Sequence, residues 1–329
     1  MTLINTSYWF PLAALICLHS AFVLPTELNG FDISKNILPL GSIQQGGPPK
    51  DGIPAILSPR YLTANKAKHM RDDDMILGFL TKNQSFAYPR YIMNWHEIVN
   101  DEVNDNAFII TYCPLCGTGM AFSSNISNRL HPTEKTIFGI SGLLYNSDVL
   151  LYDKNTESLW SQMARTAVSG IYAGTALKQL NLEHTTWAHW VSQHPETKVL
   201  SEAQGFSRDY RRDPYSGYET SSRLYFKTLR RAPKTYHPKE RILGVQFGSL
   251  SKAYPFTALR KHNKQYFRDK IGKHVYYITW HPDHQSASVR DASGKTTPST
   301  IAYWFAWFAF HPDTQVFQAE NTNTETLTH

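Results

Sequence analysis

Short apolar and alternating segments separated by tight turns predict a chain rich in β-strands, with few helices. Two stretches share one pattern, in which Ile-Leu-Gly at 76–78 and 242–244 precedes Ala-Tyr-Pro at 87–89 and 253–255. A proline is favoured in the first turn of a helix. The apolar spacing after the first of these prolines predicts a helix over 90–99. Each stretch therefore predicts two strands followed by a helix.

The similarity between the two stretches continues along the chain in the same order. The matched segments are 101–103 with 269–271, 108–112 with 276–280, and 152–156 with 310–314. Five collinear blocks are typical of a duplication. We therefore predict an α+β fold, an internally duplicated unit of mainly antiparallel sheet with short helices in a pseudo-twofold arrangement.

This repeat also predicts how the chain is divided. The predicted parts are a signal peptide at 1–22, an extended N-terminal segment at 23–75, repeat unit one at 76–160, an insertion or linker with one helix (185–193) at 161–240, repeat unit two at 241–317 and a disordered tail at 318–329. A functional site is expected at the junction of the two units, where a cleft forms naturally.

The first residues predict export. Residues 9–24 form a nearly uncharged apolar run of signal-peptide length, with a plausible cleavage point after Ala21. The longest apolar run elsewhere, 301–310, is too short to cross a bilayer, so no stable membrane span is expected after signal removal. The net charge of +6 is scattered and predicts no nucleic-acid partner. We expect a soluble periplasmic protein.

The strongest chemical signal is the segment Cys-Pro-Leu-Cys-Gly at 113–117. Thiolates two residues apart can grip one tetrahedral metal ion, and a glycine after them permits the tight turn of a zinc knuckle. A thiol–disulfide active site is an alternative, although Gly117 and Gly119 are poor residues for the helix that it requires. A structural disulfide is the third possibility. The spacing alone leaves all three open.

Four histidines are candidate partners for Cys113 and Cys116 as zinc or copper ligands. His281 and His284 occupy the positions equivalent to the cysteines in the second repeat, so facing repeats would form a Cys2His2 site. His96 is the preferred third ligand because its helix leads into the strand that carries the cysteines. His311 follows the apolar run 301–310. At least one of these imidazoles is predicted to lie within about 4 Å of a sulfur. Asp148 is a turn residue or a possible acid.

Several longer motifs resemble the bacterial family catalogued as domain of unknown function 3179. The motifs lie at 46–54 (GGPPKDGIP), 95–101 (WHEIVND), 112–117 (YCPLCG), 141–148 (SGLLYNSD), 156–162 (TESLWSQ), 213–215 (DPY), 304–307 (WFAW) and 311–314 (HPDT). The resemblance implies an exported bacterial protein and brings no agreed activity with it.

The functional hypothesis is an exported periplasmic protein that binds zinc or copper, with an unknown small molecule or a metal donor as its partner. A redox enzyme that uses Cys113 and Cys116 is the first alternative, and a non-catalytic binding module with a structural disulfide is the second. Neither a dinucleotide fingerprint, a phosphate-binding loop nor a serine-hydrolase elbow occurs in the sequence. The sequence names no reaction.

Overall fold

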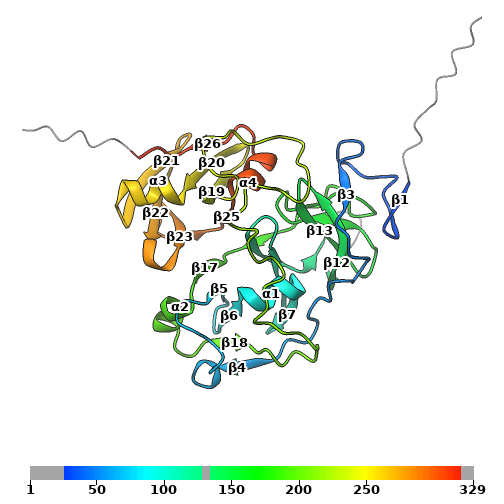
Figure 1. The fold of residues 1–329 in the computed structure, drawn as a ribbon, viewed down its shortest axis with the longest axis horizontal. Coiled ribbons are helices and arrows are strands. Elements are labelled where there is room, and N and C mark those ends of the chain that lie inside the picture. Colours follow the sequence, from blue (N-terminus) through cyan, green and yellow to red (C-terminus); the bar gives the residue numbers. More distant parts are fainter. Residues whose placement is uncertain (1–25, 128–133, 320–329) are drawn as a thin grey trace, which may run out of the picture.

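The computed structural model describes residues 26–127 and 134–319. The predicted signal peptide and residues 320–329 of the predicted tail lie outside the described residues. The fold is mostly β, with 40% of residues in strands and 12% in helices, and five small sheets are arranged as the blades of a propeller (Figure 1). Among the described residues, none of the helices is both long enough and apolar enough to traverse a bilayer.

The predicted fold class, an α+β duplicated unit in a pseudo-twofold arrangement, is therefore wrong. The helices explain part of the error, since each of the four α-helices in the described residues has only seven residues and cannot form a layer against the sheets. The sheet between the repeats explains the rest. Residues 138–167, which belong partly to unit one and partly to the insertion, build four strands of a blade that β3 (Ile43–Gln45) completes and that has no counterpart in unit two.

Sheets I and IV have matching strand pairings. Sheet I has the order β17-β5-β6-β18-β4, and sheet IV has the order β25-β19-β20-β26. The strands β17, β5, β6 and β18 of sheet I correspond to β25, β19, β20 and β26 of sheet IV. In both sheets one pair is parallel, β18 with β6 and β26 with β20, and the other pairs are antiparallel. The strands of sheet I are β4 (Tyr61–Thr63), β5 (Met75–Leu80), β6 (Ser85–Pro89), β17 (Glu183–Thr186) and β18 (Lys198–Leu200); those of sheet IV are β19 (Arg241–Phe247), β20 (Leu250–Pro255), β25 (Thr300–Tyr303) and β26 (Gln315–Val316).

Sheets II and V are antiparallel meanders that also correspond. The orders are β16-β9-β8-β7 and β21-β22-β23-β24. The strands of sheet II are β7 (Ile98–Val103), β8 (Asn106–Cys113), β9 (Thr118–Ser123) and β16 (Gln179–Leu180); those of sheet V are β21 (Tyr266–Ile271), β22 (His274–His281), β23 (Ser286–Asp291) and β24 (Thr296–Thr297). The cysteine motif lies in the β8–β9 turn and the His-Pro-Asp-His motif in the β22–β23 turn.

Sheet III, with the order β15-β14-β13-β12-β3, is the fifth blade. Its strands are β3 (Ile43–Gln45), β12 (Phe138–Tyr145), β13 (Asp148–Asp153), β14 (Leu159–Ser161) and β15 (Thr166–Ala167); two small pairs, β1 (Glu27–Leu28) with β2 (Phe31–Asp32) and β10 (Asn125–Ile126) with β11 (Glu134–Lys135), lie outside the five sheets. The register of β12 on β13 shifts between Ile140 and Leu143. Such a bulge bends the strand.

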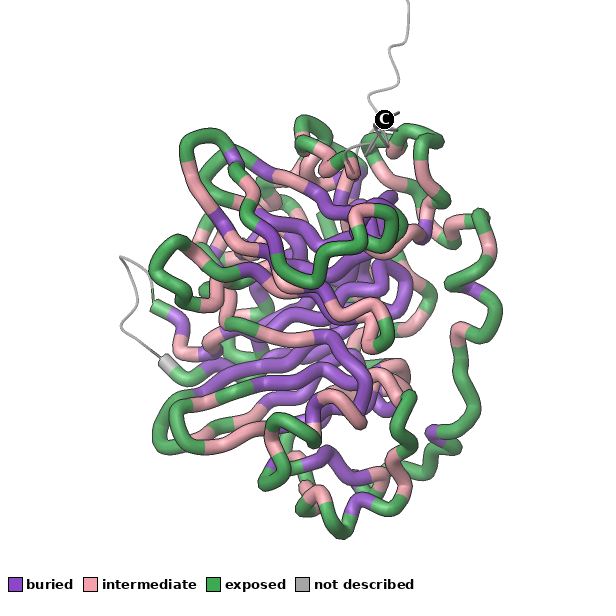
Figure 2. The backbone as a smooth tube through the Cα atoms, turned by 90° about the vertical axis from the view of Figure 1, so that its left-hand side faces the viewer, coloured by how far each residue is buried: buried purple, intermediate pink, exposed green. Residues whose placement is uncertain are grey.

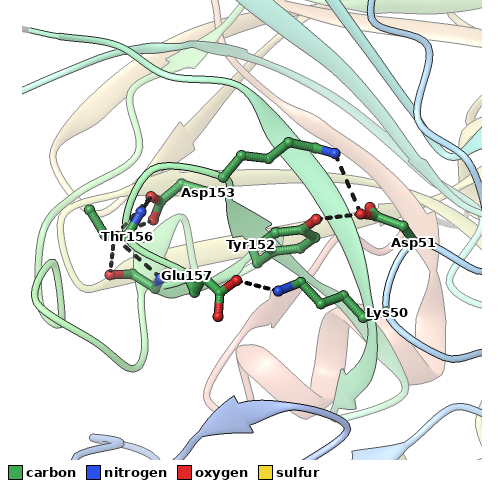
Figure 3. Close-up of polar contacts among 8 residues, drawn as sticks. Lys50, Asp51, Tyr152, Asp153, Thr156 and Glu157 are labelled. Carbon is green, nitrogen blue, oxygen red and sulfur yellow. Dashed lines mark hydrogen bonds and ion pairs between the residues drawn. The ribbon is translucent and has the colours of Figure 1, made fainter.

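Polar contacts attach the N-terminal segment to sheet III (Figure 3). Lys50 forms an ion pair with Glu157 in the turn between β13 and β14. Asp51 accepts a hydrogen bond of 2.5 Å from the Tyr152 hydroxyl and lies 3.4 Å from the Lys154 amine. Three polar side chains, Glu157, Tyr152 and Lys154, therefore hold the turn at Lys50 and Asp51, which lies between β3 and β4.

Two helices begin where the prolines predict. α1 (Arg90–His96) follows Pro89 and α3 (Phe256–His262) follows Pro255. α1 is shorter than the predicted 90–99 because Glu97 adopts a left-handed conformation, with φ of 57°, and ends the helix. The remaining helical elements are α2 (Trp187–Gln193), α4 (Trp304–Phe310) and the 3₁₀ turns η1 (Ala64–Lys66) and η2 (Pro282–His284).

A tryptophan on each of α2 and α4 packs against a glycine of its sheet. A Cβ atom on Gly78 would lie 2.4 Å from the Trp190 ring, and one on Gly244 would lie 2.3 Å from the Trp307 ring. Only glycine leaves room for these rings. Each indole N–H donates to a threonine hydroxyl seven residues later, at 2.9 Å for Thr197 and 3.0 Å for Thr314.

This packing corrects one block of the sequence alignment. The sequence comparison matched 310–314 with 152–156. The structural counterpart of Trp307 and Thr314 is instead the pair Trp190 and Thr197. Buried positions are concentrated along the strands and exposed positions in the connecting loops (Figure 2). The largest apolar cluster contains the β8–β9 turn, β12 to β14 and α4, so the cysteine motif lies within the protein core.

Candidate metal centre

The β8–β9 turn places both cysteines inside the protein. Cys113 ends β8 and pairs in register with Thr118, and the Cys116 amide donates to the Cys113 carbonyl at 3.2 Å. Gly117 completes the turn with φ of +60°, and a Cβ atom there would lie 2.7 Å from the Tyr303 ring. Both its conformation and the close ring require glycine. The turn therefore fixes the direction of both sulfurs through its backbone.

Asp148, the first residue of β13, completes a group of three. The sulfurs of Cys113 and Cys116 and a carboxylate oxygen of Asp148 all lie within 4.8 Å of one another, and all three residues are buried. Among the described residues this is the only group of at least three such side chains that could hold a metal ion. Both cysteines are free thiols in this structure. Sheets II and III thus jointly supply the ligand atoms.

The surroundings leave one ligand atom without a hydrogen bond of normal geometry. The Cys116 thiol donates to the Ser147 carbonyl at 3.3 Å, while Asp148 Oδ2 accepts from the Met163 amide at 3.0 Å. Asp148 Oδ1 is buried and makes no hydrogen bond of normal geometry within the described part of the chain, and the two thiols are the donors near this carboxyl. An unpaired buried carboxylate oxygen costs free energy unless a cation or donor approaches it. This oxygen fits a metal ligand.

Burial makes every acid of the site harder to ionise. It raises the pKa of the Cys113 thiol, and it raises that of Cys116 well above its usual value. Burial also raises the pKa of Asp148 to about 7 and that of Glu97 to about 8. The cause is loss of hydration of the charged forms. A bound cation would favour ionisation of these groups and reverse the effect.

A cavity of about 390 Å³ adjoins this group. It is bordered by Leu115, which lies between the cysteines, by Val149, which follows Asp148, and by Glu97. The Tyr215 hydroxyl donates to Glu97 Oε1 at 3.3 Å and lines the same cavity. A larger cavity of about 820 Å³, lined by most residues of 224–238 with Trp304 and Phe305, shares Tyr225 and Phe226 with it. The smaller cavity therefore borders chain neighbours of the three ligand residues, while Cys113, Cys116 and Asp148 themselves line neither cavity.

His96, the preferred third ligand from the sequence, is engaged elsewhere. It is fully buried, with Nδ1 donating to the Pro54 carbonyl at 2.8 Å and Nε2 accepting from the Tyr210 hydroxyl at 2.7 Å. The carbonyl can only accept, so Nδ1 carries the proton in the neutral ring. Both nitrogens are used, and burial lowers the pKa of this histidine. His96 positions the end of α1 rather than joining the cysteine group.

The other three candidate histidines do not join the cysteines either. His281 and His284 lie in the β22–β23 turn, where both rings contact the His189 ring of α2. The His311 ring packs against the Trp307 ring in a tilted arrangement, with centroids 4.0 Å apart. Burial, with the charge of Arg165, lowers the pKa of His311 to about 4. The predicted Cys2His2 arrangement is thus absent from the described residues, because each turn packs on its own set of neighbours.

Asp148, which the sequence predicts only as a turn residue or a possible acid, is the third member of the group with Cys113 and Cys116. It lies 35 positions after Cys113, and only the packing of sheet III on the β8–β9 turn brings the two together. The one available signal was its place in the motif at 141–148, where an aspartate follows an Asn-Ser pair with positive φ at the start of β13.

A family model described as "Protein of unknown function (DUF3179)" matches residues 50–314. The chain belongs to this family. No curated protein and no solved structure matches it. The DUF3179 region begins at the Lys50 contact with sheet III and ends at Thr314, the partner of Trp307. It contains the three members of the thiol–carboxylate group and all four candidate histidines.

Proposed function

We propose that this DUF3179 protein binds one zinc or copper ion through Cys113, Cys116 and Asp148. The observation that supports this most directly is the buried group itself, in which three ligand atoms lie within 4.8 Å of one another and, among the described residues, Asp148 Oδ1 makes no hydrogen bond of normal geometry. Thiolate sulfur and carboxylate oxygen are both zinc ligands, and thiolates also select copper(I).

Three protein ligands leave a coordination position for another group. Metal sites that act on substrates keep such a position open, whereas structural sites are closed by four protein ligands. A small molecule in the cavity of about 390 Å³ beside Leu115 and Val149 would reach that position after a movement of these side chains, because none of the three ligand residues lines the cavity. Glu97 and Tyr215, which border the cavity, would contact the incoming molecule. The reaction class is left open by this geometry.

The thiol pKa values favour a metal over a disulfide-exchange function. Exchange requires a reactive thiolate, and catalytic cysteines have lowered pKa values. Burial raises the pKa of both thiols here, and the nearby Asp148 carboxyl raises both further. No cationic side chain is among the main causes of either shift within the described residues. A metal ion would supply the missing positive charge.

Elemental analysis tests this proposal directly. Untagged protein purified without oxygen is expected to retain about one equivalent of zinc or copper at this site, with both thiols unreactive until a chelator is added. Cys113→Ser is expected to lose that equivalent because one of the two strong thiolate ligands is gone. His237→Gln changes an exposed histidine and is expected to keep it. Metal-free wild-type protein with freely titrating thiols would overturn the proposal.

We further propose that the protein is exported to the periplasm, on the strength of the apolar run at 9–24. The expected mature N-terminus is close to residue 22. N-terminal sequencing of protein from the periplasmic fraction measures this. Recovery of residues 1 or 2 at the start of cytoplasmic protein would contradict it.

A further inference from the structure

Three histidines meet where α2 contacts the β22–β23 turn. The His189 ring on α2 lies with its centroid 4.8 Å from that of His281 and 4.3 Å from that of His284. All three side chains are half-buried at the surface. We propose that His189, His281 and His284 form a second metal site, selective for a divalent ion such as Zn²⁺ or Cu²⁺. This site is separate from the cysteine group and does not depend on it.

The β22–β23 turn has the same backbone design as the β8–β9 turn. In each, four residues connect paired strand ends, Cys113 with Thr118 and His281 with Ser286. The fourth turn residue is left-handed in both, with φ of 60° at Gly117 and 47° at Gln285. His281 and His284 therefore occupy the positions that Cys113 and Cys116 hold in the other turn. The same geometry that directs two sulfurs toward one region directs two imidazoles toward one region.

The third proposed ligand, His189, comes from the strand and helix that lie beside the histidine turn, as β25 and α4 lie beside the cysteine turn. β25 and α4 lie beside the cysteine turn, where the Tyr303 amide donates to the Cys116 carbonyl at 2.8 Å. β17 and α2 lie correspondingly beside the histidine turn, where Thr186 Oγ1 lies 2.9 Å from His284 Nδ1. α2 carries His189 on the face that meets the turn, so its imidazole completes a set of three.

In two of these rings, His284 and His189, one nitrogen has a hydrogen-bond partner and the second nitrogen is left for a metal ion. His284 Nδ1 contacts Thr186, and His189 Nε2 lies 2.6 Å from the Gln193 side-chain nitrogen. Metal-bound histidines normally use one nitrogen for the ion and the other for such an orienting partner. Thr186 and Gln193 would supply that orientation.

Binding requires a local rearrangement of the rings. In the arrangement described here, the three ligand nitrogens do not all lie within 4.8 Å of one another. Rotation about the side-chain torsions would bring one nitrogen of each ring toward a common point, and none of the three side chains is fully buried. The exposed carboxylate of Asp283, in the same turn, adds negative charge beside the ion.

The two sites differ in donor chemistry, which makes them separable. Three imidazoles suit divalent zinc, copper or nickel, whereas a thiolate pair also holds copper(I). Co²⁺ can replace zinc as an optical probe, because thiolate ligands add an intense sulfur-to-cobalt charge-transfer band that imidazoles do not produce.

A Co²⁺ titration of untagged protein tests the proposal. The wild type is expected to bind two ions, and the Cys113→Ser, Cys116→Ser double variant one, without a charge-transfer band. His281→Gln with His284→Gln is expected to keep the band and lose the other ion, with affinity at that site at least about 100-fold weaker. His274→Gln, at the far end of the same strand β22, is the matched control and should bind both ions.

Two results would overturn the second site. One is an unchanged stoichiometry in the His281→Gln, His284→Gln variant. The other is a cysteine-free variant that is folded by circular dichroism and binds no Co²⁺. A wild type that binds one ion without any charge-transfer band would instead refute the cysteine site and support the histidine site, so the two proposals fail in different ways.

Discussion

Removing the metal from the site of Cys113, Cys116 and Asp148 is expected to lower the free energy of unfolding by about 4 kcal/mol when free Zn²⁺ stands about 1,000-fold above its dissociation constant. The reason is that the folded chain alone brings the three ligands together, so binding stabilises only the native state. Urea unfolding with Zn²⁺ and with a chelator measures the difference. The measurement is made in the His284→Gln variant, so that Zn²⁺ binding at the proposed histidine site does not contribute to the difference.

Variants of the ligands give the controls for that measurement. Asp148→Asn is expected to reduce the stabilisation by Zn²⁺, and Cys113→Ser to abolish it. Asp269→Asn is the matched acid control, since Asp269 pairs with Lys252 at 2.6 Å and belongs to sheet V. It should respond to Zn²⁺ like the parent. Equal unfolding curves with Zn²⁺ and with chelator would contradict the site.

Replacing Trp307 with alanine is expected to cost about 3–5 kcal/mol of stability, the usual range for a fully buried tryptophan. Trp307 is 2% exposed, packs against Gly244 and donates a hydrogen bond to Thr314, so its removal leaves a cavity between α4 and sheet IV. Trp190→Ala is expected to have an effect of similar size in sheet I. Equilibrium urea unfolding, followed by far-ultraviolet circular dichroism, measures both.

Smaller substitutions separate the packing from the hydrogen bond. Thr314→Val removes the acceptor of the Trp307 indole N–H and is expected to cost about 1–3 kcal/mol, because the donor is left buried without a partner. Gly244→Ala is expected to cost a similar amount through overpacking, since its Cβ would lie 2.3 Å from the Trp307 ring. A loss below about 1 kcal/mol for Trp307→Ala would contradict the packing argument.

Local structure could be predicted from the sequence where one residue type decides the backbone. Pro89 and Pro255 identified the starts of α1 and α3, and Gly117 identified a tight turn. The end of α1 could not be predicted in the same way. Glu97 takes a left-handed conformation that local propensity disfavours, and it is held by buried contacts from distant parts of the chain.

The architecture could not be predicted because its decisive contacts are non-local. The repeat in the sequence was visible, but its last block was aligned on short motifs at 152–156. The correct counterparts are defined by the Trp190–Thr197 and Trp307–Thr314 bonds, which depend on packing against glycines far away in sequence. Sheet III has no counterpart in the second repeat, so a model with two equal units had no place for it.

The candidate site likewise has one part that the sequence predicts and one part that it does not. The cysteine pair is visible as a spacing of three within one turn. Asp148 reaches it only through the contact between two sheets, so no spacing rule could find it. His281 and His284 lie in the turn that corresponds to the cysteine turn, as the repeat predicts, but the imidazole beside them is His189 on α2, which no repeat block contains.

The pairing of β4 with β18 has a consequence for how the chain folds as it is made. β4 ends at Thr63, and its antiparallel partner begins at Lys198, so the outer strand of sheet I waits for more than 130 residues of further synthesis. Pairing β4 with β18 costs chain entropy, because it closes the long loop between these two strands. Pairings between strands so distant in sequence are associated with slow folding. Until β18 has been synthesised, the unpaired edges of β4 and β6 are exposed and can pair with incorrect strands. Sheet IV, confined to 241–316, closes within a much shorter stretch and forms its edge without that delay.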